Sequence, residues 1–125
     1  MIKDKFDSIV SYAKNKYPDA EVYSCVVDLM LLKSDLVILF DIDQILTKEL
    51  SSSYCEVEYI VLLGIYKKYN EDSTNNNDVK FDILDIQRDI CVNNNISIVS
   101  DKISFEPAIL QGTKYLTCSC LVGIQ

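Results

Sequence analysis

The sequence predicts an α+β fold: an N-terminal helix, a mixed or antiparallel sheet, and a second amphipathic helix packed on one face of that sheet. Three observations lead to this prediction. The chain has 125 residues, the length of one ordinary domain. Its 49% hydrophobic and 25% charged residues are typical of a globular protein. Apolar residues recur with a helical period in two segments and alternate as in strands elsewhere. We therefore expect residues 1–125 to form a single domain.

The first helix is expected at residues 2–17. Its apolar residues recur at spacings of three and four: Ile2, Phe6, Ile9 and Ala13. Pro18 ends it, because the residue before a proline resists helical geometry. Residues 20–33 fit either a strand or a short buried helix, since periodicity does not separate the two for short apolar runs.

Two strands are expected next. Residues 36–43 form an apolar strand, and residues 44–53 are polar enough to be a connection, partly helical. Residues 54–67 form the longest strand. One of its faces carries Cys55, Val57, Tyr59, Val61, Leu63 and Ile65.

A polar loop follows that strand and precedes the second helix. Its composition is typical of a loop, and we interpret it as an interaction loop that orders on contact with a partner. The loop consists of Asn70, Glu71, Asp72, Ser73, Thr74, Asn75, Asn76 and Asn77.

The second helix is expected at residues 78–92, with Asp78 as its N-cap. Three asparagines at 93–95 end it. A single apolar stripe is formed by Val79, Ile83, Ile86 and Ile90.

Two strands complete the predicted sheet. Residues 96–105 form one strand, with a bend or bulge near Ser100 and Asp101 where the apolar phase changes. Residues 114–124 form the last strand, and the link between them contains Pro107 and Gly112. One face of the last strand carries Leu116, Cys118, Cys120, Val122 and Ile124.

The chain has no histidine, which excludes histidine-dependent catalysis and histidine-containing zinc sites. The three glycines are scattered, so no glycine-rich phosphate loop is present. We therefore predict no catalytic residues, no cofactor and no metal site, and a protein that is not an enzyme.

Asp41 and Asp43 offer an enzymatic alternative. A hydrophobic strand that ends in Asp-x-Asp resembles the first motif of haloacid-dehalogenase-type phosphotransferases, in which the first carboxylate is the nucleophile, the second the acid/base, and Mg²⁺ the cofactor. Gln44 and Ile45 stand where that motif has Gly-Thr. The simpler interpretation is a strand whose last carboxylates reach solvent.

Two other groups of residues have simple interpretations. Asp82, Asp85 and Asp89 could coordinate a cation, but their spacing predicts the solvated face of the second helix. Cys118 and Cys120 point to the same apolar face of a strand, which predicts two core thiols.

The net charge of −7 argues against sequence-independent binding to nucleic acid, which needs clustered Lys and Arg. The apolar runs are far shorter than the roughly 18–20 residues that span a bilayer. The N-terminal stretch lacks the features of a signal peptide. We expect a protein made in the cytoplasm that has no membrane partner.

The predicted order of elements, with its closing hairpin, resembles the tail terminator (tail completion) proteins of long-tailed phages. The closest local match is the ending: Ile103-Ser104-Phe105-Glu106-Pro107-Ala108, a short turn at Gly112, and the strand from Tyr115 to Ile124. The resemblance implies a structural virion protein of the phage neck. It implies a homo-oligomeric ring, a hexamer, that caps the tail tube and joins it to the head-tail connector proteins. DNA only passes through the lumen of such a ring. A small acidic adaptor or inhibitor is the alternative among binding proteins.

We predict that all five cysteines are free thiols: Cys25, Cys55, Cys91, Cys118 and Cys120. An odd number without the spacing of a disulfide framework is typical of a cytoplasmic chain. Thiol titration of the unfolded, unreduced protein should count five reactive groups. A count of three would reveal a disulfide.

Overall fold

The computed structural model describes residues 2–24, 34–51, 54–69, 77–100, 103–110 and 112–124. It confirms the α+β class: two helices accompany a six-stranded sheet. The helices are α1 (Ile2–Lys16) and α2 (Asn77–Asn93). The strands are β1 (Glu21–Tyr23), β2 (Leu36–Ser51), β3 (Tyr54–Lys68), β4 (Ser97–Ile98), β5 (Ser104–Leu110) and β6 (Thr113–Ile124).

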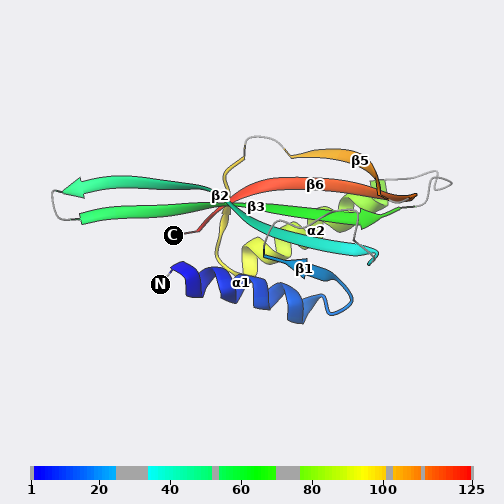
Figure 1. Ribbon diagram of the computed structural model, residues 1–125, viewed down its shortest axis with the longest axis horizontal. Coiled ribbons are helices and arrows are strands. Elements are labelled where there is room, and N and C mark those ends of the chain that lie inside the picture. The colour runs from blue at the N-terminus through cyan, green and yellow to red at the C-terminus, as the bar shows by residue number, and fades with distance from the viewer. Residues whose placement is uncertain are drawn as a thin grey trace.

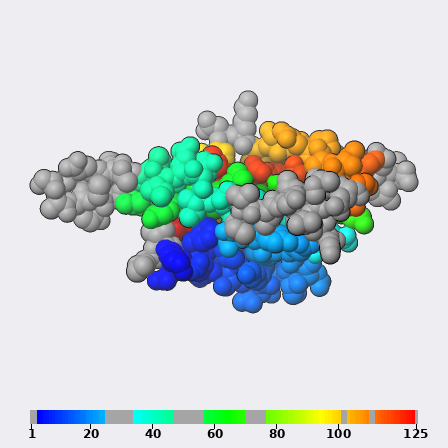
Figure 2. Space-filling model, in the orientation of Figure 1, coloured from blue at the N-terminus to red at the C-terminus, as the bar shows by residue number. Residues whose placement is uncertain are grey.

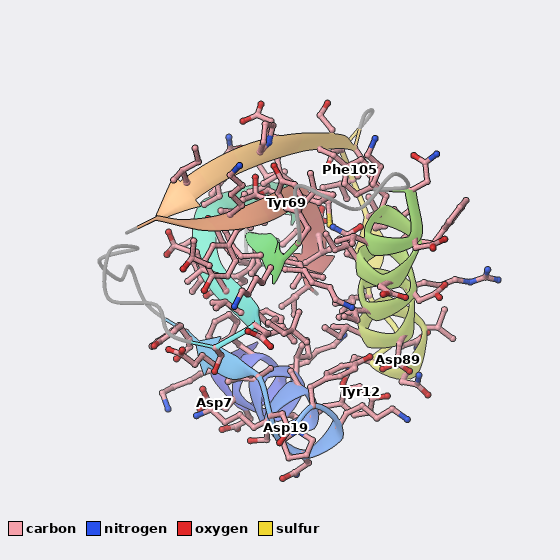
Figure 3. The ribbon with its side chains drawn as sticks, turned by 90° about the vertical axis from the view of Figure 1, so that its right-hand side faces the viewer. Asp7, Tyr12, Asp19, Tyr69, Asp89 and Phe105 are labelled. Carbon is pink, nitrogen blue, oxygen red and sulfur yellow. The ribbon has the colours of Figure 1, made fainter. Side chains whose placement is uncertain are left out.

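The sheet is mixed, with the strand order β1-β2-β3-β6-β4 and with β5 also paired to β6. The short strand β1 is parallel to β2, and the other pairs are antiparallel. Both helices lie on the concave side of this curved sheet (Figures 1 and 3). One face of the sheet and one stripe of each helix therefore enclose the main core.

The core forms because the alternation of β2, β3 and β6 places large apolar side chains on the face that the helices cover. From β3 it takes Val61, Leu63 and Ile65, all fully buried. From β6 it takes Leu116, Cys118, Cys120, Val122 and Ile124, as the spacing of the last strand predicts. Phe6 of α1 meets Phe40 of β2 edge to face, with ring centroids 6.5 Å apart.

Both predicted helices are confirmed. Ile9, Val10 and Ala13 bury the inner face of α1. In α2, Val79 packs against the core, and Ile83, Ile86 and Ile90 are buried. The helix begins at Asn77, so Asp78 lies in its first turn and not at the N-cap position. It ends at Asn93, and Asn95 follows with a φ of 58°, a conformation that asparagine tolerates.

The prediction of a connection at residues 44–53 is wrong for residues 44–51, because β2 continues to Ser51 and stays paired with β3. Residues 52 and 53 lie outside the described part of the chain. A register shift between Ile42 and Gln44 leaves Asp43 as an extra residue on β2. The residues of this segment lie in a strand because they pair with the first half of β3.

The prediction of one bent strand at residues 96–105 is also wrong. Two separate strands, β4 and β5, pair with different parts of β6. Between them, the Ser100 hydroxyl accepts a hydrogen bond of 2.7 Å from the Leu121 backbone N–H. Pro107 lies in β5 and not in a link. Among the described strands β5 pairs with β6 alone, and proline is tolerated in such an edge strand.

Part of the ambiguous segment 20–33 is resolved as a strand, since β1 occupies Glu21–Tyr23. Residues 25–33, like residues 70–76 of the predicted loop, lie outside the described part of the chain. The turn at Gly112 is described, and its φ of 77° favours glycine.

Ile83→Ala tests the packing of α2 on the sheet. Ile83 is completely buried, so its truncation should lower the free energy of unfolding by about 2–5 kcal/mol. Phe81→Ala is the matched control, because Phe81 is 64% exposed on the same helix and its removal should change stability by less than about 0.5 kcal/mol. Urea unfolding measures both. Equal losses for the two variants would contradict the assigned face of α2.

Candidate interaction surface

The most distinctive feature of the surface is a two-stranded arm formed by β2 and β3. β3 pairs with β6 only from Tyr59 onward, and β2 pairs with β1 only at Val37–Leu39. Beyond these points the two strands pair with each other alone, and they extend away from the body of the molecule (Figure 1). The outer edge of each strand there has no neighbouring strand among the described residues.

The arm exposes apolar side chains near its base. Ile42 is 46% exposed, Ile45 57% and Leu46 48%. Ile42 lies on the face of the sheet that the helices cover farther along. The coloured part of β2 lies at the surface next to the start of α1 (Figure 2). The apolar face of the sheet therefore continues past the helices that bury it. Under the base of the arm, a small cavity of about 120 Å³ is lined by Lys3, Phe6, Ile42, Tyr59, Val61 and Ile124.

A second surface feature is an open groove between α2 and β4, which we call the α2–β4 groove. Its volume is about 530 Å³. Its lining is mainly apolar and includes Cys91, Val92, Ile98 and Ile103, with Arg88 as its charged member. Val92 is 69% exposed, so an apolar side chain of α2 faces solvent at the groove.

Gln87 lines the α2–β4 groove and is almost completely buried. Its Nε2 donates a hydrogen bond of 3.2 Å to the sulfur of Cys118. Its Oε1 accepts no hydrogen bond. Among the described residues, this is the one buried side-chain oxygen or nitrogen that has no hydrogen-bond partner. Leaving such a group unsatisfied costs about 1–3 kcal/mol. The part of the core that borders the groove therefore contains a buried polar atom whose hydrogen-bonding capacity is not used.

The acidic stripe of α2 does not behave as one solvated face. Asp89 accepts hydrogen bonds from the Tyr12 hydroxyl at 3.1 Å and from the Tyr17 hydroxyl at 2.7 Å, and Tyr12 approaches Asp89 across the two helices in Figure 3. Asp82 pairs with Lys67 of β3 at 2.8 Å. Asp82 and Asp85 are both exposed, as the prediction of a solvated face requires, whereas Asp89 is half-buried. Asp89 therefore fastens α1 to α2, a function that its spacing along α2 did not indicate.

This contact changes the acidity of Tyr17. Burial, and after it the hydrogen bond to the Asp89 carboxylate, raises the pKa of the Tyr17 phenol well above its usual range. The phenol therefore keeps its proton as the donor to Asp89 throughout the neutral range.

The cysteines of β6 are core residues, as predicted. Cys91, Cys118 and Cys120 are free and buried. Burial raises the pKa of all three thiols, that of Cys120 to about 12. A protonated thiol is a poor nucleophile and metal ligand, so these groups pack as small apolar side chains. Cys25 and the side chain of Cys55 lie outside the described residues.

Asp41 and Asp43 lie within β2, eight or more residues before its end at Ser51, so they are not the last carboxylates of a strand. Asp41 is half-buried opposite Leu62, and Asp43 is exposed at the register shift. The neighbouring strand β3 is antiparallel, whereas the phosphotransferase alternative implies a doubly wound parallel sheet.

Of the predicted interaction loop, Asn70, Glu71, Asp72, Ser73, Thr74, Asn75 and Asn76 lie outside the described residues, and Asn77 begins α2. The loop follows the end of β3 that is remote from the arm. Its function stays a prediction.

Sequence reasoning missed the arm, although one signal was present. The strand expected at residues 54–67 is much longer than the strand expected at 36–43, so residues 36–43 alone could not pair with its whole length. The nearest residues able to pair with that half are 44–51, and they do so.

No group of three or more His, Cys, Asp or Glu side chains is arranged to hold a metal ion in the described ranges. Among the same residues, no helix combines the length and the apolar character needed to cross a membrane. The sequence matches no protein-family model, and no curated protein matches it.

Tyr17→Phe tests the contact between the helices. It should lower the free energy of unfolding at pH 7 by about 1.5 kcal/mol, the worth of a hydrogen bond to a charged group. Because the folded-state pKa of Tyr17 is raised, its contribution is fully present below about pH 10, the pKa of an unfolded tyrosine, and is lost as the pH rises toward the folded pKa. Stability of the variant should therefore decline less steeply than that of the parent between pH 10 and 11. Urea unfolding across this range measures both effects; parental stability and slope in the variant would contradict the contact.

Proposed function

We propose that this protein is a structural subunit that assembles with copies of itself into a ring, and that the ring is a phage tail terminator. The observation that carries the assembly is the β2–β3 arm. It combines two strand edges that pair with no other described strand with three exposed apolar side chains, features typical of a protein-binding element. The arm extends from the body as a two-stranded ribbon, a shape that suits a large partner (Figure 1).

The phage assignment is supported by the order of elements. α1 precedes the sheet, α2 packs on one face, and β5 and β6 form a closing hairpin about Gly112. This is the arrangement in the resemblance to tail terminator proteins. That resemblance supplies the number six for the ring, a tail tube and head-tail connector proteins as partners, and a virion location.

The charge of the chain is compatible with a ring through which DNA passes. A net charge of −7 does not favour a lasting grip on phosphates. An acidic inner wall would repel the duplex and let it move.

The same charge favours a second candidate, a small acidic adaptor or inhibitor that binds a basic protein as a monomer or dimer. A charged surface of one sign steers association with a partner of the opposite sign. The two candidates differ in oligomeric state and in the requirement for a tube, so one experiment separates them.

The experiment is to mix the purified protein with isolated tail tubes and to examine the tube ends by electron microscopy, with native mass spectrometry of the protein alone as a second readout. We expect a closed ring, most simply of six copies, at one end of the tube. Tubes polymerised in its presence should stop at a uniform length. A protein that stays monomeric with tubes and leaves their ends bare would contradict the proposal and favour the adaptor.

A further inference from the structure

The arm needs a partner for its stability as well as for its function. A two-stranded ribbon in water is marginally stable on its own. Here the ribbon also leaves Ile42 and Ile45 about half exposed on the face that the helices bury elsewhere. Burying an isoleucine is worth about 1.5–3 kcal/mol, so contact with an apolar surface stabilises the arm substantially.

The α2–β4 groove is an open, mainly apolar surface of the kind that could cover the exposed side chains of the arm. Val92 and Ile98 present apolar surface on its two sides, from the helix and from the strand. The arm offers aliphatic side chains on a narrow ribbon, and the groove is an open aliphatic channel. Each surface therefore covers the kind of area that the other exposes.

The arm and the α2–β4 groove also carry opposite charges beside their apolar residues. Asp43 is exposed on the arm between Ile42 and Ile45, and Arg88 is exposed at the groove beside Val92. Within the described chain, neither the side chain of Asp43 nor that of Arg88 makes a hydrogen bond or ion pair. A free carboxylate beside the apolar residues of one surface and a free guanidinium beside those of the other are complementary.

We propose that the β2–β3 arm of one copy docks in the α2–β4 groove of the next copy, with Ile45 packed against Val92 and Ile98 and with Asp43 paired to Arg88. The inference deepens the proposed function, from which it takes a second copy of this chain as the partner. Because the two surfaces are different, the contact is head-to-tail. Each added copy leaves one arm and one groove free, and the last pair closes a ring when the rotation per copy allows it.

The test uses two variants that each disable one surface. Ile45→Lys places a charge on the arm, and Val92→Lys places one in the groove; both positions are largely exposed, so both proteins should fold. In sedimentation velocity over a concentration series, each variant alone should self-associate at least tenfold more weakly than the parent. Mixed together, they should form a 1:1 heterodimer and nothing larger, because one intact arm meets one intact groove.

Ile109→Lys is the matched control. Ile109 is 67% exposed on β5, outside the arm and the groove, and this variant should associate like the parent. The charge pair is tested separately: Asp43→Arg and Arg88→Asp should each weaken association, and the double variant should recover it.

A mixture of Ile45→Lys and Val92→Lys that remains monomeric would overturn the proposal. So would loss of association in Ile109→Lys, or unchanged association in either surface variant alone. An arm that pairs with the arm of another copy would appear as association that Ile45→Lys abolishes and Val92→Lys does not.

Failure here is distinguishable from failure of the proposed function. If the parent forms rings on tubes and both variants join them normally, the arm contact is wrong and the ring stands. If the heterodimer forms but no tube end is ever capped, the contact stands and the tail terminator assignment is wrong.

Discussion

The length of β3 is the constraint on which the rest of the structure depends. At about 3.3 Å per residue its 15 residues span roughly 50 Å, whereas the 17 residues of α2 span about 26 Å at 1.5 Å per residue. A helix laid along the sheet can therefore cover only about half of this strand. Where β3 is covered, Val61, Leu63 and Ile65 are fully buried. Where the helices and β6 stop, β3 has β2 as its remaining partner, and the arm results.

The body is held together mainly by apolar burial, and the polar contacts set the positions of the helices. The Lys67–Asp82 pair is partly exposed on both sides, and such a pair contributes about 0–1 kcal/mol. A single buried isoleucine of α2 contributes about 1.5–3 kcal/mol. The Tyr12 and Tyr17 bonds to Asp89 lie at the edge of this core, where they fix how α1 lies against α2. These directional bonds therefore join the two helices directly, in addition to the apolar contacts that each helix makes with the sheet.

Local periodicity was sufficient to predict both helices, the buried half of β3 and the core face of β6, because burial on one face leaves a repeating pattern in the sequence. It was insufficient for residues 44–51, where pairing with β3 determines the strand, because the consecutive apolar residues Ile45 and Leu46 are both exposed and carry no periodic signal. It was insufficient also at Ser100, since two short strands on one neighbour produce the same change of phase as one bent strand. The arm, the α2–β4 groove and the Tyr17–Asp89 contact depend on residues far apart in the chain. They become visible only once the register of β2 and β3 and the packing of α1 against α2 are known.

Assembly of such a subunit has to overcome electrostatic repulsion between its copies, since each carries a net charge of −7. Repulsion between exposed charges is screened beyond about 10 Å at 0.1 M salt, whereas an apolar contact does not depend on that screening. In the proposed ring, the aliphatic side chains of the arm and groove therefore supply the free energy of association. The single Asp43–Arg88 pair contributes little to that free energy and determines which surfaces meet and in which register. The same division is present inside the subunit, where buried isoleucines stabilise the body and the Asp89 hydrogen bonds orient its helices.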